Sequence, residues 1–238
     1  MRFRLSNARR ATGGVALLVV TSVLAALTAD AQPGSPQTDP SRTLRRVMVR
    51  DADLTGVGYD QGRPDAPVVV VNFSDFGCPY CARFARETYP ALEREFVRTG
   101  QVLFKYVPFA MGIFPNGKQA ARASECAAEQ GKFWPMHERL YARQRDWKNT
   151  IKAFPVFREE ARRLGLNEPA FARCYDTRRT DRRTEAASIQ AKRLGIRATP
   201  TFYVDGRAVE GALPLAQFQT LLRAQVAAAR RAAVGAAR

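Results

Sequence analysis

The chain has 238 residues, of which 46% are hydrophobic and 25% are charged. These values are close to those of ordinary globular proteins, so they exclude a disordered or fibrous chain, and the length allows one ordinary domain or one domain with a sizeable insertion. The formal net charge is +16, but the arginines are spread along the whole chain with no compact basic stripe between aromatic residues. We therefore expect no specific nucleic-acid partner.

The first 31 residues have the features of a secretory signal peptide. Residues 1–10 carry four arginines and no acid, and residues 11–29 carry no charge. The following Ala29-Asp30-Ala31 is a pattern that signal peptidase accepts. An uncleaved membrane anchor is the alternative, because the uncharged run approaches the length of a membrane span. We expect an exported protein, periplasmic or otherwise extracytoplasmic, with a membrane-anchored form as the alternative.

The next part of the chain predicts a linker and then a βαβ unit. Residues 32–45 are rich in Pro, Ser, Thr and Gln, which is typical of a flexible linker. A short strand is expected over 47–49, and the β-branched run 67–73 predicts a strand buried on both faces. A helical pattern over 82–98 is followed by a further strand pattern over 102–109. Strand, helix and strand in this order predict two parallel strands.

Residues 111–194 have an almost wholly helical pattern. Apolar residues recur at helical spacing, and glycines such as Gly165 and Gly195 end two of the predicted helices. We therefore predict a helical domain inserted after the βαβ unit.

The chain then returns to strand patterns. Residues 201–204 and 208–210 flank an Asp-Gly turn and predict a hairpin, and a last helix begins near Pro214. The Ala/Arg-rich residues 227–238 are expected to fray. The predicted fold class is α/β, with the helical domain inserted between the two parts of the other domain, residues 46–110 and 195–226.

The chemistry-bearing motif is Cys78-Pro79-Tyr80-Cys81, which follows the buried strand and opens the next helix. A helix N-terminus favours a thiolate, so Cys78 is predicted to be an exposed nucleophile with a low pKa. Cys81, one turn later, is predicted to be the more buried resolving thiol. The alternatives are an inert disulfide and a zinc site, but zinc would need two further ligands nearby. We expect neither a metal nor a cofactor.

Two segments resemble the thioredoxin superfamily: FSDFGCPYC, residues 73–81, and LGIRATPTFYVDGR, residues 194–207. The helical segment between them resembles the insertion of the DsbA-like branch, whose members are exported thiol–disulfide oxidoreductases with a thioredoxin fold. The resemblance implies that Pro200, preceded by Thr199, is a cis-proline facing the active-site disulfide. Such a segment leaves backbone groups free for an extended substrate, so Thr199 and Pro200 are expected to bind substrate together with Pro79 and Tyr80.

The resemblance also implies a structural disulfide between Cys126 and Cys174, for which two buried free thiols are the alternative. One position departs from the family, because relatives usually carry a buried acid where this chain has Asn72. Asp75 is interpreted as a turn cap, so proton transfer is expected to rely on water or another group. His137, the one histidine of the chain, is interpreted as a packing or surface residue.

The resulting functional prediction is a dithiol oxidase that introduces disulfides into exported proteins. Its expected partners are unfolded or reduced exported proteins and a membrane protein resembling DsbB that reoxidises the cysteine pair. A reductase or isomerase of the same fold is one alternative, because the dipeptide Pro79-Tyr80 does not decide the direction of exchange. A client-binding module without catalysis is the other.

Overall fold

The computed structural model describes residues 47–49 and 52–236. The predicted signal peptide and linker, residues 1–45, therefore lie outside the described part of the chain. Within that part, none of the helices combines the length and the hydrophobicity needed to cross a bilayer.

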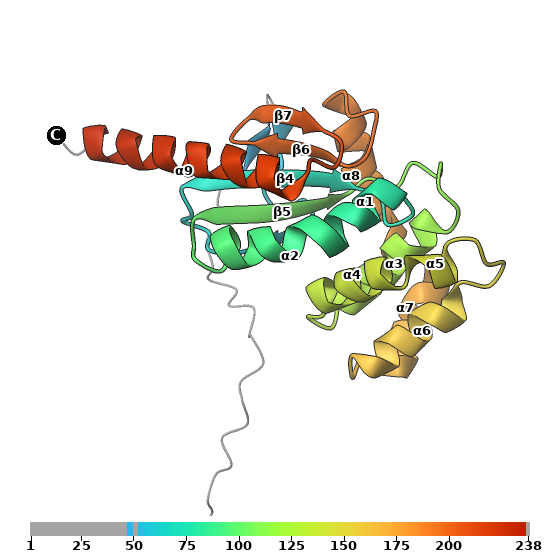
Figure 1. Ribbon diagram of the computed structural model, residues 1–238. Coiled ribbons are helices and arrows are strands. Elements are labelled where there is room, and N and C mark those ends of the chain that lie inside the picture. The colour runs from blue at the N-terminus through green and yellow to red at the C-terminus, as the bar shows by residue number, and fades with distance from the viewer. Residues whose placement is uncertain (1–46, 50–51, 237–238) are drawn as a thin grey trace, which may run out of the picture. The chain divides into compact units, whose positions relative to one another are not determined.

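A mixed five-stranded sheet, in the order β3-β5-β4-β6-β7, forms the centre of the fold (Figure 1). The central strand β4 pairs in parallel with β5, as the βαβ pattern predicted, whereas the other neighbours are antiparallel. A separate two-stranded ribbon joins β1 to β2. The strands are β1 (Met48–Val49), β2 (Ala52–Asp53), β3 (Tyr59–Gln61), β4 (Val68–Ser74), β5 (Val102–Pro108), β6 (Thr201–Val204) and β7 (Arg207–Glu210).

Both faces of the sheet are covered by helices because successive residues of the buried strand β4 point to opposite faces. Val68 and Val70 pack with side chains of the helical segment that follows β4 and of the last helix, α9 (Leu215–Ala236). Val71 and Phe73 pack on the other face with α8 (Asp181–Arg193). The helical segment after β4 combines α1 (Pro79–Arg83) and α2 (Tyr89–Leu92) with π-helical turns over Phe84–Thr88 and Glu93–Val97.

The helices between β5 and β6 confirm the predicted fold class, a thioredoxin-like α/β fold with a helical insertion. Their buried faces share one apolar cluster with Phe76 and both cysteines of the CxxC motif. The insertion therefore packs directly on the segment that carries the thiols. Its helices are α3 (Gly117–Ala128), α4 (Phe133–Ala142), α5 (Gln144–Trp147), α6 (Phe154–Arg163) and α7 (Glu168–Thr177), and α8 then returns to the sheet.

Two features differ from the sequence prediction. The helix α8, which the prediction placed in the inserted domain, packs on the sheet through Ala187 and Ala191. The segment expected to fray from residue 227 continues α9 as far as Ala236. Alanine and arginine favour helix, and no proline or glycine interrupts this run before Gly235.

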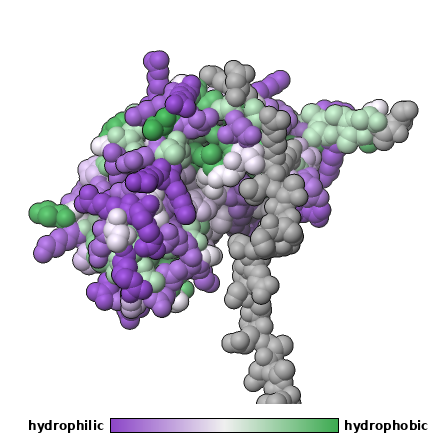
Figure 2. Space-filling model, turned by 180° about the vertical axis from the view of Figure 1, so that it is seen from behind, coloured by the Kyte–Doolittle hydropathy of each residue, from purple (hydrophilic) through white to green (hydrophobic). Residues whose placement is uncertain are grey.

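The surface of the described residues is mostly polar. Figure 2 shows hydrophilic side chains over most of the visible face, with hydrophobic residues scattered between them. Tyr80 and Ile113, which are 57% and 64% exposed, belong to the few large apolar side chains that solvent reaches, and both line a cavity beside the CxxC motif. The exposed apolar surface is thus partly gathered at the predicted site.

Candidate active site

The first cysteine of the motif caps a helix. Cys78 is the N-cap residue of α1, its backbone N–H donates to the carbonyl of Asp75 at 3.0 Å, and Pro79 occupies the first helical position. Proline suits this position because its missing N–H would have no partner inside the helix. The N-terminal amides and the helix dipole therefore point at the Cys78 sulfur.

Cys78 is more buried than the sequence predicted, whereas Cys81 is buried as expected. Cys78 and Cys81 are each 1% exposed, so the expectation of an exposed nucleophile was wrong. The helical insertion causes this burial, since residues of α3 and α4 belong to the apolar cluster that surrounds the motif. Cys78 also lines an adjoining cavity with a volume of about 340 Å³.

The two sulfurs have opposite electrostatic character. A hydrogen bond from the Cys81 thiol, aided by the backbone N–H groups of Tyr80 and Cys81, lowers the pKa of Cys78 to about 6 against the effect of burial. Burial raises the pKa of Cys81 well above its ordinary value. At neutral pH Cys78 is a thiolate and Cys81 keeps its proton, which is the arrangement that two-step thiol–disulfide exchange requires.

A distant segment completes the site. The peptide bond between Thr199 and Pro200 is cis, and the Cys78 thiol lies 3.2 Å from the carbonyl oxygen of Thr199. Pro79 and Tyr80 are exposed beside Cys78. The structure thus brings together all six residues that the sequence placed at the thiol site: Cys78, Pro79, Tyr80, Cys81, Thr199 and Pro200.

The other two cysteines form a disulfide with each other. Cys126 on α3 is joined to Cys174 on α7, with the Cα atoms 5.7 Å apart. Both residues are 1% exposed. This bond links two helices of the insertion and is closed to solvent.

Asp75 lies between the thiol site and the insertion. It is 2% exposed, and its Oδ1 accepts the N–H of Gly77 at 2.8 Å, so it does cap the turn as interpreted. It also lies against the N-terminus of α3, where a Cβ atom on Gly117 would stand 2.4 Å from Oδ1. Burial raises the pKa of Asp75 to about 7, with the nearby Cys78 adding to the effect. The sequence analysis missed this second contact, for which the glycine that begins α3 was the one available signal.

Two amide side chains, which the sequence analysis did not consider, hold the loops around the site. Gln144 on α5 donates to the carbonyl oxygens of Phe76 and Cys78, at 2.5 and 3.0 Å. Asn116 donates to three carbonyl oxygens at the end of α5 and in the loop after it, those of Trp147, Lys148 and Thr150, at 2.8 to 3.0 Å. No local sequence pattern indicates either set of contacts.

Aromatic and hydroxyl groups fill the space behind the motif. His137 is 3% exposed and contacts the rings of Phe76, Tyr106 and Tyr141. Burial lowers its pKa to about 3, so it is a neutral packing residue at physiological pH. The Tyr141 hydroxyl lies 3.2 Å from that of Tyr106 and 3.4 Å from the Oγ of Ser74.

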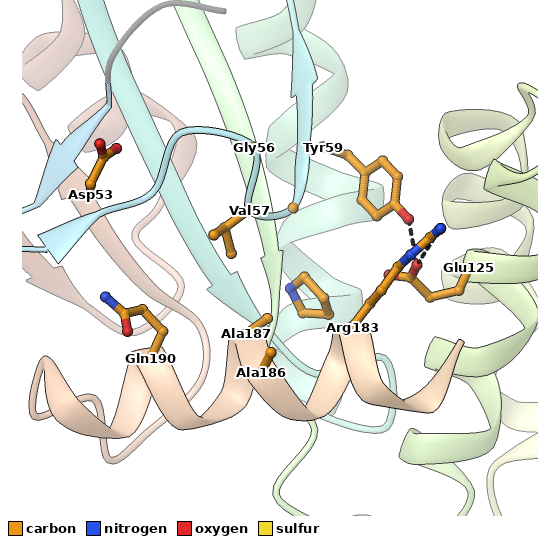
Figure 3. Close-up of a pocket in the computed structure, with 11 residues that line it drawn as sticks. Asp53, Gly56, Val57, Tyr59, Glu125, Arg183, Ala186, Ala187 and Gln190 are labelled. Carbon is orange, nitrogen blue, oxygen red and sulfur yellow. Dashed lines mark hydrogen bonds and ion pairs between the residues drawn. The ribbon is translucent and has the colours of Figure 1, made fainter. Parts of the chain in front are cut away.

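A larger cavity of about 540 Å³ lies away from the sulfurs, between the loop before β3 and the helices α3 and α8 (Figure 3). Its main polar groups bind one another. Glu125 accepts a hydrogen bond from the Tyr59 hydroxyl at 2.7 Å and pairs with Arg183 at 3.7 Å. This cavity contains neither cysteine of the CxxC motif, so we assign the thiol chemistry to the smaller cavity at Cys78.

A family model described as "Thioredoxin" matches residues 55–224. The chain therefore belongs to the thioredoxin family. Disulfide bond formation protein D of Bacillus subtilis is 27% identical over 164 residues, which cover 63% of this chain and 68% of that protein. The Na(+)/H(+) antiporter NhaA 3 of Salinispora tropica is 32% identical over 172 residues, 71% of this chain. The match spans only about a quarter of that antiporter, 25% of its length.

Solved structures agree with this family. Oxidised BdbD from Bacillus subtilis superposes with a TM-score of 0.64 at 25% identity, over 70% of this chain and 91% of that one. A thioredoxin-like oxidoreductase from Silicibacter pomeroyi gives a TM-score of 0.57 at 27% identity, over 73% of this chain and 92% of that one. The fold of these two proteins thus extends over most of the described residues.

Proposed function

We propose that this chain is an exported protein thiol–disulfide oxidoreductase, and in the first place a dithiol oxidase that introduces disulfides into exported proteins. The observation that carries the proposal is the pairing of Cys78, whose pKa is lowered to about 6, with the buried and protonated Cys81 beside the cis Thr199–Pro200 bond. The names of two relatives, a disulfide bond formation protein and a thioredoxin-like oxidoreductase, support the same activity. Export rests on the pattern of residues 1–31.

The reaction consists of two exchanges. A client thiolate attacks the Cys78 sulfur of the Cys78–Cys81 disulfide, the bond between the two sulfurs breaks, and Cys81 leaves as a thiolate that takes up a proton. A second client thiolate then attacks the client sulfur of the mixed disulfide and releases Cys78 as a thiolate. The client loses two electrons and the cysteine pair gains them, so a membrane oxidant resembling DsbB must reoxidise the pair.

The low pKa of the Cys78 thiol supports the oxidising direction of exchange. A thiol with a low pKa is a good leaving group, and stabilising the reduced form makes the disulfide more oxidising. Thr199, Pro200, Pro79 and Tyr80 surround Cys78 and would bind the client segment that carries the attacking cysteine.

The reduction potential of the Cys78–Cys81 pair tests the proposal. A value near about −120 mV, measured against glutathione buffers, is expected for an oxidase, whereas a value at or below roughly −230 mV would assign the chain to the reductases. A Cys81→Ser variant should trap a client on Cys78, and a Cys78→Ser variant should lose all turnover. If the Cys78→Ser protein still protects clients in the cell, the chain is a binding module and not an enzyme.

A further inference from the structure

The cavity beside Cys78 has an apolar wall. Phe109, Met111, Ile113 and Phe114, all from the segment between β5 and α3, line one side of it. A wall of this kind accepts an apolar side chain of an extended peptide. It does not by itself discriminate between clients, because most unfolded segments carry such residues.

Positive charge surrounds the same cavity. Arg197 lines it and is exposed. Two more cations lie on aromatic side chains of the cavity: the guanidinium of Arg83 is 5.3 Å from the centre of the Tyr80 ring, and the ammonium group of Lys148 is 5.2 Å from that of Phe114. Across residues 47–49 and 52–236, none of these three cations forms an ion pair.

The acidic side chain of the cavity is buried. Among the residues that line it, Asp75 is the only acid, and it is 2% exposed. Its carboxylate accepts the Gly77 amide and lies against the N-terminus of α3, so backbone groups and the helix dipole offset its charge. Lys148 also interacts electrostatically with this carboxylate, so it offsets part of the same charge. A client therefore meets an apolar wall bordered by Arg197 and Arg83, neither of which forms an ion pair within the described part of the chain.

We propose that this cavity selects client segments that carry an acidic residue within two positions of the reacting cysteine, with Arg197 binding that carboxylate. The inference rests on the proposed function, because it describes the substrates of the same thiol. The cations also favour the approach of the client thiolate to the Cys78 sulfur, since they stabilise negative charge near the point of attack. An apolar residue on the other side of the cysteine would occupy the wall.

Single-turnover kinetics with matched peptides test this selection. Each peptide contains one cysteine flanked by Asp, Asn or Lys, and the rate of mixed-disulfide formation with the oxidised protein is measured at constant pH. Flanking charges also change the pKa of the peptide thiol, so each rate is divided by the rate of the same peptide with hydroxyethyl disulfide, which is uncharged. The step joins the peptide sulfur to Cys78 and releases Cys81 as a thiolate, which is then protonated.

We expect the Asp peptide to react at least about fivefold faster than the Lys peptide at low salt. The Asp peptide gains one exposed ion pair with Arg197, whereas the Lys peptide is repelled by the same side chain. The ratio should fall below about twofold in 1 M NaCl, where charges are screened within about 3 Å. Arg197→Ala should remove most of the preference and Arg197→Lys should keep it. Arg231→Ala, which removes an equal charge from the exposed end of α9, should leave it unchanged.

Two results would overturn the inference while leaving the proposed function intact: a normalised ratio within twofold of one, or a preference that survives Arg197→Ala. A preference lost equally in Arg231→Ala would assign it to the net charge of the protein and also reject the role of Arg197. If none of the peptides reacts with the oxidised protein, the oxidoreductase function itself fails, and the selection fails with it.

Discussion

Breaking the Cys126–Cys174 disulfide should lower the free energy of unfolding by about 4 kcal/mol. The bond closes a loop with a sequence separation of 48 residues, and the loss of chain entropy for a loop of that length corresponds to about 4 kcal/mol at 25 °C. This is a large share of the roughly 5–15 kcal/mol that stabilises a typical domain. Because both cysteines are 1% exposed, the bond should also resist reductants until the protein unfolds.

The measurement is urea unfolding of a Cys78→Ala/Cys81→Ala variant, in which only the structural disulfide remains. The oxidised and the fully reduced forms are compared by circular dichroism, and with a slope of about 2 kcal/mol/M the midpoint should differ by about 2 M urea. A quadruple variant that also carries Cys126→Ala and Cys174→Ala provides the control, since reductant should not change its midpoint. A difference below about 1 kcal/mol would refute the argument that the bond constrains the unfolded chain.

Three further predictions concern the surroundings of the thiols. In the dithiol form the pKa of Asp75 is raised from 3.8 to about 7, mainly by burial and in part by Cys78. In the oxidised protein the charge of Cys78 is absent but burial still raises the pKa of Asp75, so its ionisation destabilises the fold as pH rises above about 4. Urea unfolding of the oxidised protein at pH 4.5 and 8 should therefore show Asp75→Asn gaining stability over the wild type at pH 8, by less than about 4 kcal/mol, and equal stabilities would contradict the burial argument. In the reduced protein, the rate of Cys78 alkylation should rise with pH with a midpoint near pH 6. The variant Cys81→Ala should move that midpoint upward, because it removes the hydrogen bond from Cys81 that lowers the pKa of Cys78 most. An unchanged midpoint would show that the helix N-terminus acts alone. Gly117→Ala should lower the free energy of unfolding by about 1–3 kcal/mol, seen as a lower thermal midpoint, because its Cβ would stand 2.4 Å from the Asp75 carboxylate. The control variant Gly235→Ala, whose Cβ would have no atom within 4 Å, should be neutral or stabilising.

The sheet and the thiol motif could be predicted from sequence because their signals are local. The β-branched run of β4 and the CxxC motif that follows it are contiguous, and both occupy the predicted places. The glycine at position 195 and the Thr199–Pro200 segment likewise mark the return to the sheet. Sequence patterns of this kind indicate the burial and backbone conformation of the residues that form them and of their near neighbours in the chain.

The contacts between the insertion and the site could not be predicted in this way. Gln144 is a polar residue in a short helix, and nothing near it in the chain indicates that its amide binds the carbonyls of Phe76 and Cys78. The burial of Cys78 has the same origin, because the residues that cover the motif come from helices far along the chain. Local patterns define elements, whereas the way in which two elements pack depends on the whole set of side chains between them.

Gln144 also has a consequence for any attempt to reduce this protein to a smaller catalyst. A version that keeps only the sheet and the helices packed on its two faces would lack α3 to α7. It would lose Gln144, which binds the carbonyls of Phe76 and Cys78, and it would expose the apolar cluster that encloses Cys81. The resolving thiol would then lie in water, and burial would no longer separate its acidity from that of Cys78. Such a remnant would keep the CxxC motif and lose the asymmetry between its two sulfurs, so the helical insertion is as much a part of the redox centre as the cysteines themselves.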